Sequence, residues 1–132
     1  MTPRQIDLVQ TCFQKVVPIA AKAADLFYDR LFEIAPEVRS LFPADLTSQK
    51  QKLMTMLGTA VTNLHQLETI LPAVKELGQR HKGYGVTAAH SAPVGAALLW
   101  TLETGLGPDF TPEVKTAWTE TYMALSGVMT AA

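Results

Sequence analysis

Prolines and glycines divide this chain into segments, and within each segment the apolar residues recur at intervals of three and four. The first segment starts after Thr2-Pro3 and is broken at Pro18, and the second ends before Pro36. A short piece after it, PEVRSLF, is stopped by Pro43. Apolar spacing bounded by such residues predicts α-helices for the longer segments and one or two helical turns for the short piece.

The rest of the chain has the same pattern, and its helix boundaries follow from the same signals. We expect a cap at Thr47 or Ser48, an opening proline at Pro72, a start near Ser91 with Pro93 in the first turn, an end at Gly105 and Gly107, and a last start at Thr111-Pro112. No strand pattern or hairpin dipeptide competes. The sequence therefore predicts one all-α domain over residues 1–132 with six to eight helices, which fits poorly with a plain four-helix bundle.

Composition argues against several classes of function. A formal net charge of −1 argues against a nucleic-acid partner, because binding along a phosphate backbone needs a basic surface. Apolar residues make up 48% of the chain but form no run long enough to cross a bilayer. The N-terminus does not resemble a secretory signal, and the single cysteine, Cys12, excludes an internal disulfide. These features favour a cytoplasmic protein with no membrane insertion.

Conventional catalytic and metal sites find little support. The three histidines, His65, His81 and His90, lie sixteen and nine residues apart, so no two share a helical face as zinc or di-iron ligands. Cys12 lies on the apolar stripe of its helix, where a buried inert thiol is the simplest interpretation. Because no strand is expected, no glycine-rich phosphate loop is expected either. These patterns alone describe a helical domain without a visible active site.

One histidine has a more informative setting. In the segment LPAVKELGQRHKGYGV, Leu77 and His81 lie four residues apart near the end of a short helix, and Val86 follows. A neutral imidazole in such a place can bind iron through one ring nitrogen. Its other nitrogen can donate to a carbonyl one turn back, that of Leu77, which selects the tautomer. A lone histidine is more often a surface or core residue, so this pattern is weak by itself.

Four segments, in order, resemble the helices of bacterial globins. DLFYDRLFEIAPEVRSLFP is similar to the second and third helices, and TSQKQKLMTMLGTAV to the distal helix. VKELGQRHKGYGV is similar to the proximal helix, and VGAALLWTLETGLGPDFTPEVKTAWTETYMALSGVM to the last two. The whole chain resembles single-domain bacterial globins akin to the haem domain of flavohaemoglobins, and its last two helices also resemble neuroglobin. The resemblance implies the globin fold around haem b (iron protoporphyrin IX).

The resemblance also implies roles for residues of this sequence. It makes His81 the proximal iron ligand and places Phe42 on the porphyrin face, where an ordinary core phenylalanine would also lie. It places Tyr28 and Gln49 beside the bound gas, with Leu53 one turn beyond Gln49 on the same face. Both polar side chains can donate a hydrogen bond. For Tyr28 the alternative is a core aromatic residue whose hydroxyl is bonded to the backbone.

For Gln49 the alternative is an exposed side chain in a hydrophilic stretch, since a register error would move the distal position to Lys50 or Lys52. Lys52 is also a candidate to reach a haem propionate from the rim, although a solvated lysine is an equal alternative. For other possible pocket walls, core packing and haem contact are not separable by sequence: Val86, Val94, Leu98, Tyr122 and Met123.

This sequence departs from the bacterial pattern around the proximal histidine. Many relatives support that histidine with a tyrosine and a late glutamate, but here Ser91 stands at the tyrosine position and no acid follows Glu120. We therefore expect a neutral histidine and little peroxidase-like activity. Neuroglobin-like relatives have a distal histidine where this chain has Gln49, so we expect five-coordinate ferrous iron.

The function implied is reversible binding of dioxygen, nitric oxide and carbon monoxide, with high oxygen affinity. Conversion of nitric oxide to nitrate is a second possibility, and it needs a separate reductase, because no flavin or NAD domain is expected within this sequence. The alternatives are a haem-based redox or gas-sensing module and a haem-free helical interaction protein. The last leaves Tyr28, Phe42, Gln49 and His81 without a joint explanation.

Overall fold

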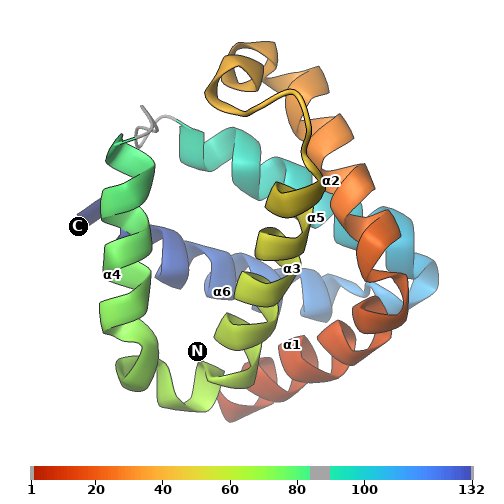
Figure 1. Cartoon of the computed structure of the whole chain (residues 1–132). Helices are drawn as coiled ribbons and strands as arrows, with labels where there is room; N and C mark the ends of the chain where they lie inside the picture. The colour runs from red at the N-terminus through yellow and green to blue at the C-terminus, as the bar shows by residue number, and fades with distance from the viewer. Residues whose placement is uncertain (1, 84–89, 132) are drawn as a thin grey trace.

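The computed structural model describes residues 2–83 and 90–131, apart from the side chains of residues 67–69, 82, 83 and 128–131. It confirms the all-α prediction: the described residues form six α-helices joined by short 3-10 turns, without strands. The helices, labelled as in Figure 1, are α1 (Pro3–Val16), α2 (Ala20–Ile34), α3 (Thr47–Thr62), α4 (Leu67–Gly83), α5 (Ser91–Leu106) and α6 (Pro112–Ala131). The PEVRSLF piece forms a 3-10 helix over Pro36–Leu41, as expected.

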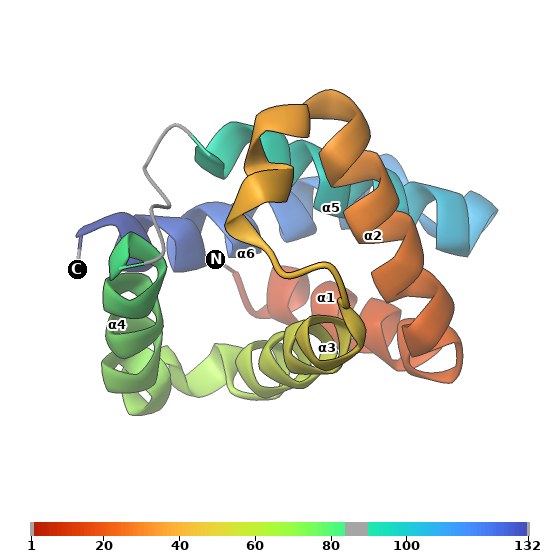
Figure 2. The ribbon, with the colours of Figure 1, turned by 45° about the horizontal axis from the view of Figure 1, so that its top comes forward.

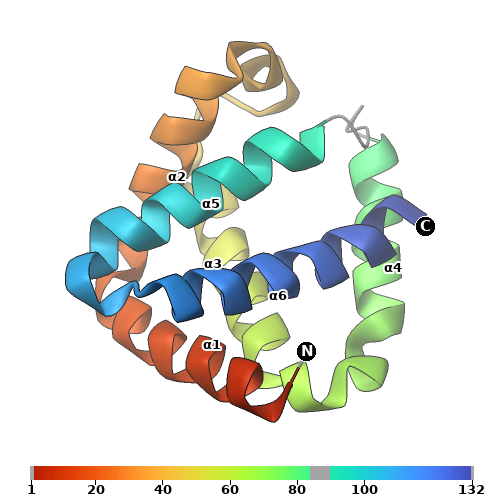
Figure 3. The same cartoon turned by 180° about the vertical axis from the view of Figure 1, so that it is seen from behind.

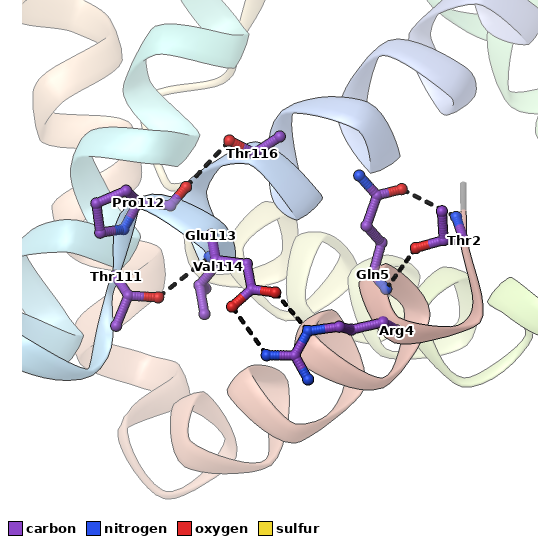
Figure 4. A network of polar contacts seen from close by, with 8 residues as sticks. All are labelled: Thr2, Arg4, Gln5, Thr111, Pro112, Glu113, Val114 and Thr116. Atoms are coloured by element: carbon purple, nitrogen blue, oxygen red, sulfur yellow. Dashed lines mark hydrogen bonds and ion pairs between the residues drawn. The ribbon is translucent and has the colours of Figure 1, made fainter.

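Helix α1 begins at a capping box. The Thr2 hydroxyl accepts a hydrogen bond from the Gln5 backbone N–H at 3.1 Å, and the Gln5 side chain accepts one from the Thr2 backbone N–H at 2.9 Å. At the start of α6, the Thr111 hydroxyl accepts from the Val114 N–H at 3.2 Å, which confirms the expected Thr-Pro start. An ion pair between Arg4 and Glu113 joins the two helix starts (Figure 4).

Two of the expected helix starts are wrong. Neither Thr47 nor Ser48 caps α3, because the helix already begins at Thr47 and Leu46 precedes it without a side-chain cap. The Asp45 carboxylate takes that role by accepting from the Thr47 N–H at 2.9 Å and from its hydroxyl at 2.7 Å. Pro72 does not open a helix but lies inside α4, which starts at Leu67. A proline this close to a helix start removes one backbone hydrogen bond, and the helix continues through it.

The C-terminal boundary of α5 is as expected. Gly107 follows the helix with a φ of +55°, a left-handed conformation that glycine adopts without the penalty of a side chain. Gly105, expected to share this role, lies inside the helix.

The helices cross one another around a single apolar core. Helix α6 runs between α5 and α1 (Figure 3), and the Trp118 side chain on α6 is 1% exposed. Helix α2 packs on α5 and α3, and α3 also packs on α1. Helix α4 packs mainly on α6, and Figures 1 and 2 show it standing apart from α3. Within the described ranges, no helix is long and apolar enough to span a bilayer.

Candidate functional site

The His81 imidazole, near the C-terminal end of α4, is oriented by its own helix. Its Nδ1 lies 2.7 Å from the carbonyl oxygen of Leu77, one turn back, and the ring is partly buried. Because a carbonyl only accepts hydrogen bonds, Nδ1 carries a proton, and in the neutral form of the ring the lone pair is on Nε2. This confirms the hydrogen bond expected from the sequence. It leaves Nε2 as a nitrogen able to bind a metal ion.

Tyr28 and Gln49 come together from different helices. Tyr28 lies in the middle of α2 with 3% of its surface exposed, and Gln49 lies in the first turn of α3. Burial raises the pKa of the Tyr28 phenol, and a side-chain hydrogen bond with Gln49 partly offsets this rise. The Tyr28 hydroxyl therefore stays protonated and can still donate its own hydrogen.

Aromatic rings hold Tyr28 in place. Its ring meets Phe27 edge to face at 5.0 Å between centroids and Phe42 in the same manner at 5.6 Å. Phe32 lies 5.9 Å from Tyr28 and 5.5 Å from Phe42, which closes the group. Edge-to-face packing of this kind stabilises aromatic pairs beyond simple burial. We call Phe27, Tyr28, Phe32 and Phe42 the aromatic cluster; it joins α2 to the segment that leads into α3.

Arg39 is a site-supporting residue that the sequence interpretation missed. Its guanidinium donates to the backbone carbonyls of Phe42 at 3.2 Å, Pro43 at 3.0 Å and Ala44 at 3.3 Å. It also lies 5.2 Å over the Phe32 ring. Arg39 thus fixes the extended segment that carries Phe42. The sequence did offer one signal for this role. Arg39 lies one turn before Phe42, in a helical piece too short for the backbone carbonyls at its end to be satisfied within it.

The other candidate residues have mixed outcomes. Leu53 and Leu98 line one small internal cavity, and Val94 is partly buried against the core. Lys52 is exposed, while Lys50 pairs with Asp25 on α2 at 2.8 Å. Val86 lies outside the described residues.

On the C-terminal helix, α6, one candidate pocket residue, Met123, is wrong, and the contacts of another, Tyr122, are defined. Met123 is 64% exposed and is not a pocket wall, because neighbouring residues on a helix point about 100° apart and Tyr122 takes the inward direction. The Tyr122 hydroxyl donates to the Ser91 carbonyl at 2.6 Å. A Cβ added to Gly95 would come 2.8 Å from the Tyr122 ring, so glycine permits this close approach. The Ser91 hydroxyl meets that of Ser126 on α6.

Comparison with known proteins decides the family. The family model described as Globin matches residues 25–129. The chain belongs to the globin family. It is 38% identical over 101 residues to the flavohemoprotein of Bacillus subtilis (strain 168), a match that covers 73% of this chain and 25% of that protein. It is 31% identical over 119 residues to neuroglobin of Danio rerio, covering 80% of this chain and 75% of neuroglobin.

Solved structures give the same fold. This globin superposes on an engineered carbene transferase, described as a putative nitric oxide dioxygenase from Rhodothermus marinus, with a TM-score of 0.85 at 27% identity, over 99% of this chain and 92% of the other. It superposes on a bacterial globin from Campylobacter jejuni with a TM-score of 0.82 at 26% identity, over 98% and 94% of the two chains. The chain spans about a quarter of the flavohemoprotein, so that protein's full activity is not transferred with the fold.

Globins bind haem and gaseous ligands, and the residues of this globin fit that cofactor. The donor set supplies an imidazole oriented by its own helix, from α4, and two side chains able to donate hydrogen bonds, from α2 and α3. Phe42, Leu53, Leu77 and Val94 are only partly buried by the protein, as apolar residues are when a planar cofactor covers the rest of their surface.

Proposed function

We propose that this globin binds haem b through His81 Nε2 and reversibly binds dioxygen, nitric oxide and carbon monoxide at five-coordinate ferrous iron, with Tyr28 and Gln49 as distal donors. The observation that supports it best is the pairing of Tyr28 with Gln49. A buried phenol beside an amide side chain, with a raised pKa that keeps its hydroxyl protonated, is a ready donor for a polar ligand.

Haem supplies an open coordination position and electron density that polarises bound dioxygen. The residues of this chain stabilise that charge, since hydrogen bonds to charged acceptors contribute about 1.5–3 kcal/mol each. Two donors therefore slow oxygen loss by roughly two decades or more, at about 1.4 kcal/mol per factor of ten. Carbon monoxide is less polarised and gains less, so this arrangement favours high oxygen affinity with low preference for carbon monoxide.

The remaining residues hold the cofactor rather than the gas. In this proposal Phe42 packs on the porphyrin face, the Leu77 carbonyl orients His81, and the exposed Lys52 reaches a propionate at the rim. Leu53 and the α5 and α6 side chains of Val94, Leu98 and Tyr122 provide apolar walls. The Ser91 hydroxyl is engaged with Ser126, and a backbone carbonyl is the Nδ1 partner of His81. A neutral imidazole of this kind suits holding oxygen more than cleaving it.

Removal of nitric oxide is a second role that the relatives support. The structural neighbour described as a putative nitric oxide dioxygenase points to the reaction of nitric oxide, dioxygen and one electron to give nitrate. The electron requires a reductase, which we propose is a separate cytoplasmic partner. The competing role is a haem-based redox or gas-sensing module.

A visible spectrum of the purified protein, with and without reductant and carbon monoxide, tests the haem proposal. We expect a Soret band that shifts on reduction and again with carbon monoxide. Absence of this band after haem addition overturns the proposal. Nitric oxide consumption under oxygen, measured with and without an added flavin reductase, then separates the two roles, because a gas sensor does not turn over.

A further inference from the structure

An ion pair joins the first turn of α3 to α2 beside the distal residues (Figure 1). Lys50 Nζ lies 2.8 Å from Asp25 Oδ1. On α3, Lys50 directly follows Gln49; on α2, Asp25 precedes Tyr28 by three residues, a spacing that makes them neighbours on the helix surface. The two helices thus meet through two adjacent polar contacts: the inner one between Tyr28 and Gln49, and this outer ion pair.

The outer contact constrains the rotation of α3 about its own axis. Consecutive side chains of an α-helix point about 100° apart, so a rotation that turns Lys50 toward Asp25 also sets the direction of Gln49. With the inner contact alone, the long Gln49 side chain could follow a small rotation of the helix. Two contacts from consecutive residues to one neighbouring helix leave a much narrower range of rotation that satisfies both.

Deep core packing does not hold this end of α3. The buried residues of the helix are Ala60 and Val61, both in its last turn, and Leu46 provides no side-chain cap at the start. In the first turn, Gln49 and Lys50 are only partly buried. Polar contacts therefore determine more of the position of the first turn than of the last.

A second carboxylate acts on the same turn. Asp45 accepts hydrogen bonds from the Thr47 backbone N–H at 2.9 Å and from its hydroxyl at 2.7 Å. These bonds lower the pKa of the Asp45 carboxyl, and the charge of Lys50 adds to the effect. The Lys50 ammonium therefore lies near two carboxylates, one on α2 and one in the segment before α3, and links the start of α3 to both.

We propose that the ion pair between Asp25 and Lys50 positions Gln49 at the distal site. Both charged residues act through Gln49, and neither contacts the gas. The inference rests on the proposed gas-binding function, in which Gln49 is a donor. Its size is limited: the two side chains are 31% and 59% exposed, and a pair in such a setting changes an equilibrium by at most about fivefold.

The oxygen dissociation rate and the C–O stretching frequency of the carbon monoxide complex test this role in the haem-loaded protein. Lys50→Met keeps the apolar stem of the side chain and removes its charge, and Asp25→Asn removes the opposite charge. We expect each to accelerate oxygen dissociation by about two- to fivefold. Each should also raise the C–O stretching frequency, because a nearby hydrogen-bond donor lowers it. The double variant should match the single ones, since all three lose one contact, and Lys50→Arg should keep the wild-type values.

Two controls separate this pair from a general loss of charge. Lys15→Met breaks a different ion pair, with Asp109 at 3.6 Å, between α1 and the turn before α6. Asp29→Asn removes an exposed carboxylate one turn beyond Asp25 on α2. Neither should change the oxygen rate or the C–O stretch. High salt should accelerate oxygen dissociation in the wild type toward the rate of Lys50→Met and leave that variant unchanged, because salt screens partly exposed charges.

A contact measurement separates this inference from the proposed function. Proton NMR of the carbon monoxide complex should show a nuclear Overhauser contact between the Gln49 side-chain amide and the Tyr28 ring, and a weaker one in Lys50→Met. An unchanged contact, or an unchanged oxygen rate, in both Lys50→Met and Asp25→Asn overturns the inference even where the Soret band is normal. A missing Soret band overturns the proposed function instead, and the same contact is then compared in the proteins as purified.

Discussion

The two sides of the proposed site are held by different means. On the distal side, Tyr28 is fixed by side chains from α2, from the segment after Pro36–Leu41 and from α3. On the proximal side, His81 Nδ1 donates to the carbonyl of Leu77 in the same helix, and α4 packs mainly on α6. The distal donors are thus preorganised by long-range contacts, whereas the proximal ligand depends on local helix geometry. Changes on the distal side should spread, and changes on the proximal side should stay local.

Removal of the proximal ligand should have the largest effect. His81→Ala removes the nitrogen proposed to bind iron, and we expect haem dissociation to accelerate on the order of a hundredfold or more. Because the change is local to α4, free imidazole should restore a five-coordinate spectrum, and helix content by circular dichroism should be unchanged. His65→Ala, at an exposed histidine, is the control and should have no effect. Normal haem retention in His81→Ala would remove this residue from the site.

Removal of the distal phenol should come next. Tyr28→Phe keeps the ring in the aromatic cluster and deletes only the hydroxyl, so we expect oxygen dissociation to accelerate at least tenfold, as expected for about 1.4 kcal/mol or more. Carbon monoxide dissociation should change much less.

Gln49→Leu sharpens this result. Since Gln49 also interacts with the Tyr28 phenol, the two substitutions should be non-additive in a double-mutant cycle. Additive effects would contradict the coupling between the two distal donors, and an unchanged oxygen off-rate in Tyr28→Phe would exclude the phenol.

A substitution of Arg39 tests whether a residue that does not contact the gas contributes to the positions of the distal side chains. Arg39→Met removes three hydrogen bonds to the segment 42–44, and we expect the free energy of unfolding to fall by about 1 kcal/mol, with a two- to fivefold faster oxygen off-rate. Arg30→Met is a matched control, because Arg30 also lies over an aromatic ring, that of Trp100 at 5.1 Å, and pairs with Glu33. Equal effects in both variants would show that Arg39 acts only as a surface cation.

Much of this arrangement could be predicted from the sequence, because it depends on local rules. The Leu77–His81 bond follows from a spacing of four in a helix, and the starts at Thr2 and Thr111 follow from capping preferences. The Tyr28–Gln49 pairing came only from family resemblance, since residues 21 positions apart have no local reason to meet. The support by Arg39 was missed because its acceptors are backbone carbonyls, which every residue carries, so that only the shortness of the piece before Phe42 pointed to it.

The failures have equally physical causes. The sequence predicts both Tyr122 and Met123 as pocket residues because both are apolar neighbours on one helix. Which of them faces the core depends on how α6 is rotated about its axis, and the structure turns Tyr122 inward. Proline is favoured in the first turn of a helix, which is why the sequence predicts a start at Pro72, but a 3-10 turn at Leu64–Gln66 already leads into α4. Packing of α4 on α6 outweighs the loss of one backbone bond.

The smallest expected effect is the pH dependence that the buried phenol confers on stability. Burial raises the pKa of Tyr28 above its ordinary value of 10, so above that pH the unfolded chain loses a proton that the folded protein keeps. The unfolded state then binds fewer protons, and stability falls as pH rises; below pH 10 this contribution is fully present. Each such proton contributes at most about 1.4 kcal/mol per pH unit.

Urea unfolding of the wild type and Tyr28→Phe at pH 8, 10 and 11 measures this slope. The difference in unfolding free energy between the two proteins should be constant up to about pH 9 and then shrink, because the phenylalanine variant lacks the titrating group. Buried Cys12 also has a raised pKa, and the pairwise comparison cancels its contribution. A difference that stays constant through pH 11 would mean that the Tyr28 phenol is solvated, and the preorganised distal side would lose its principal donor.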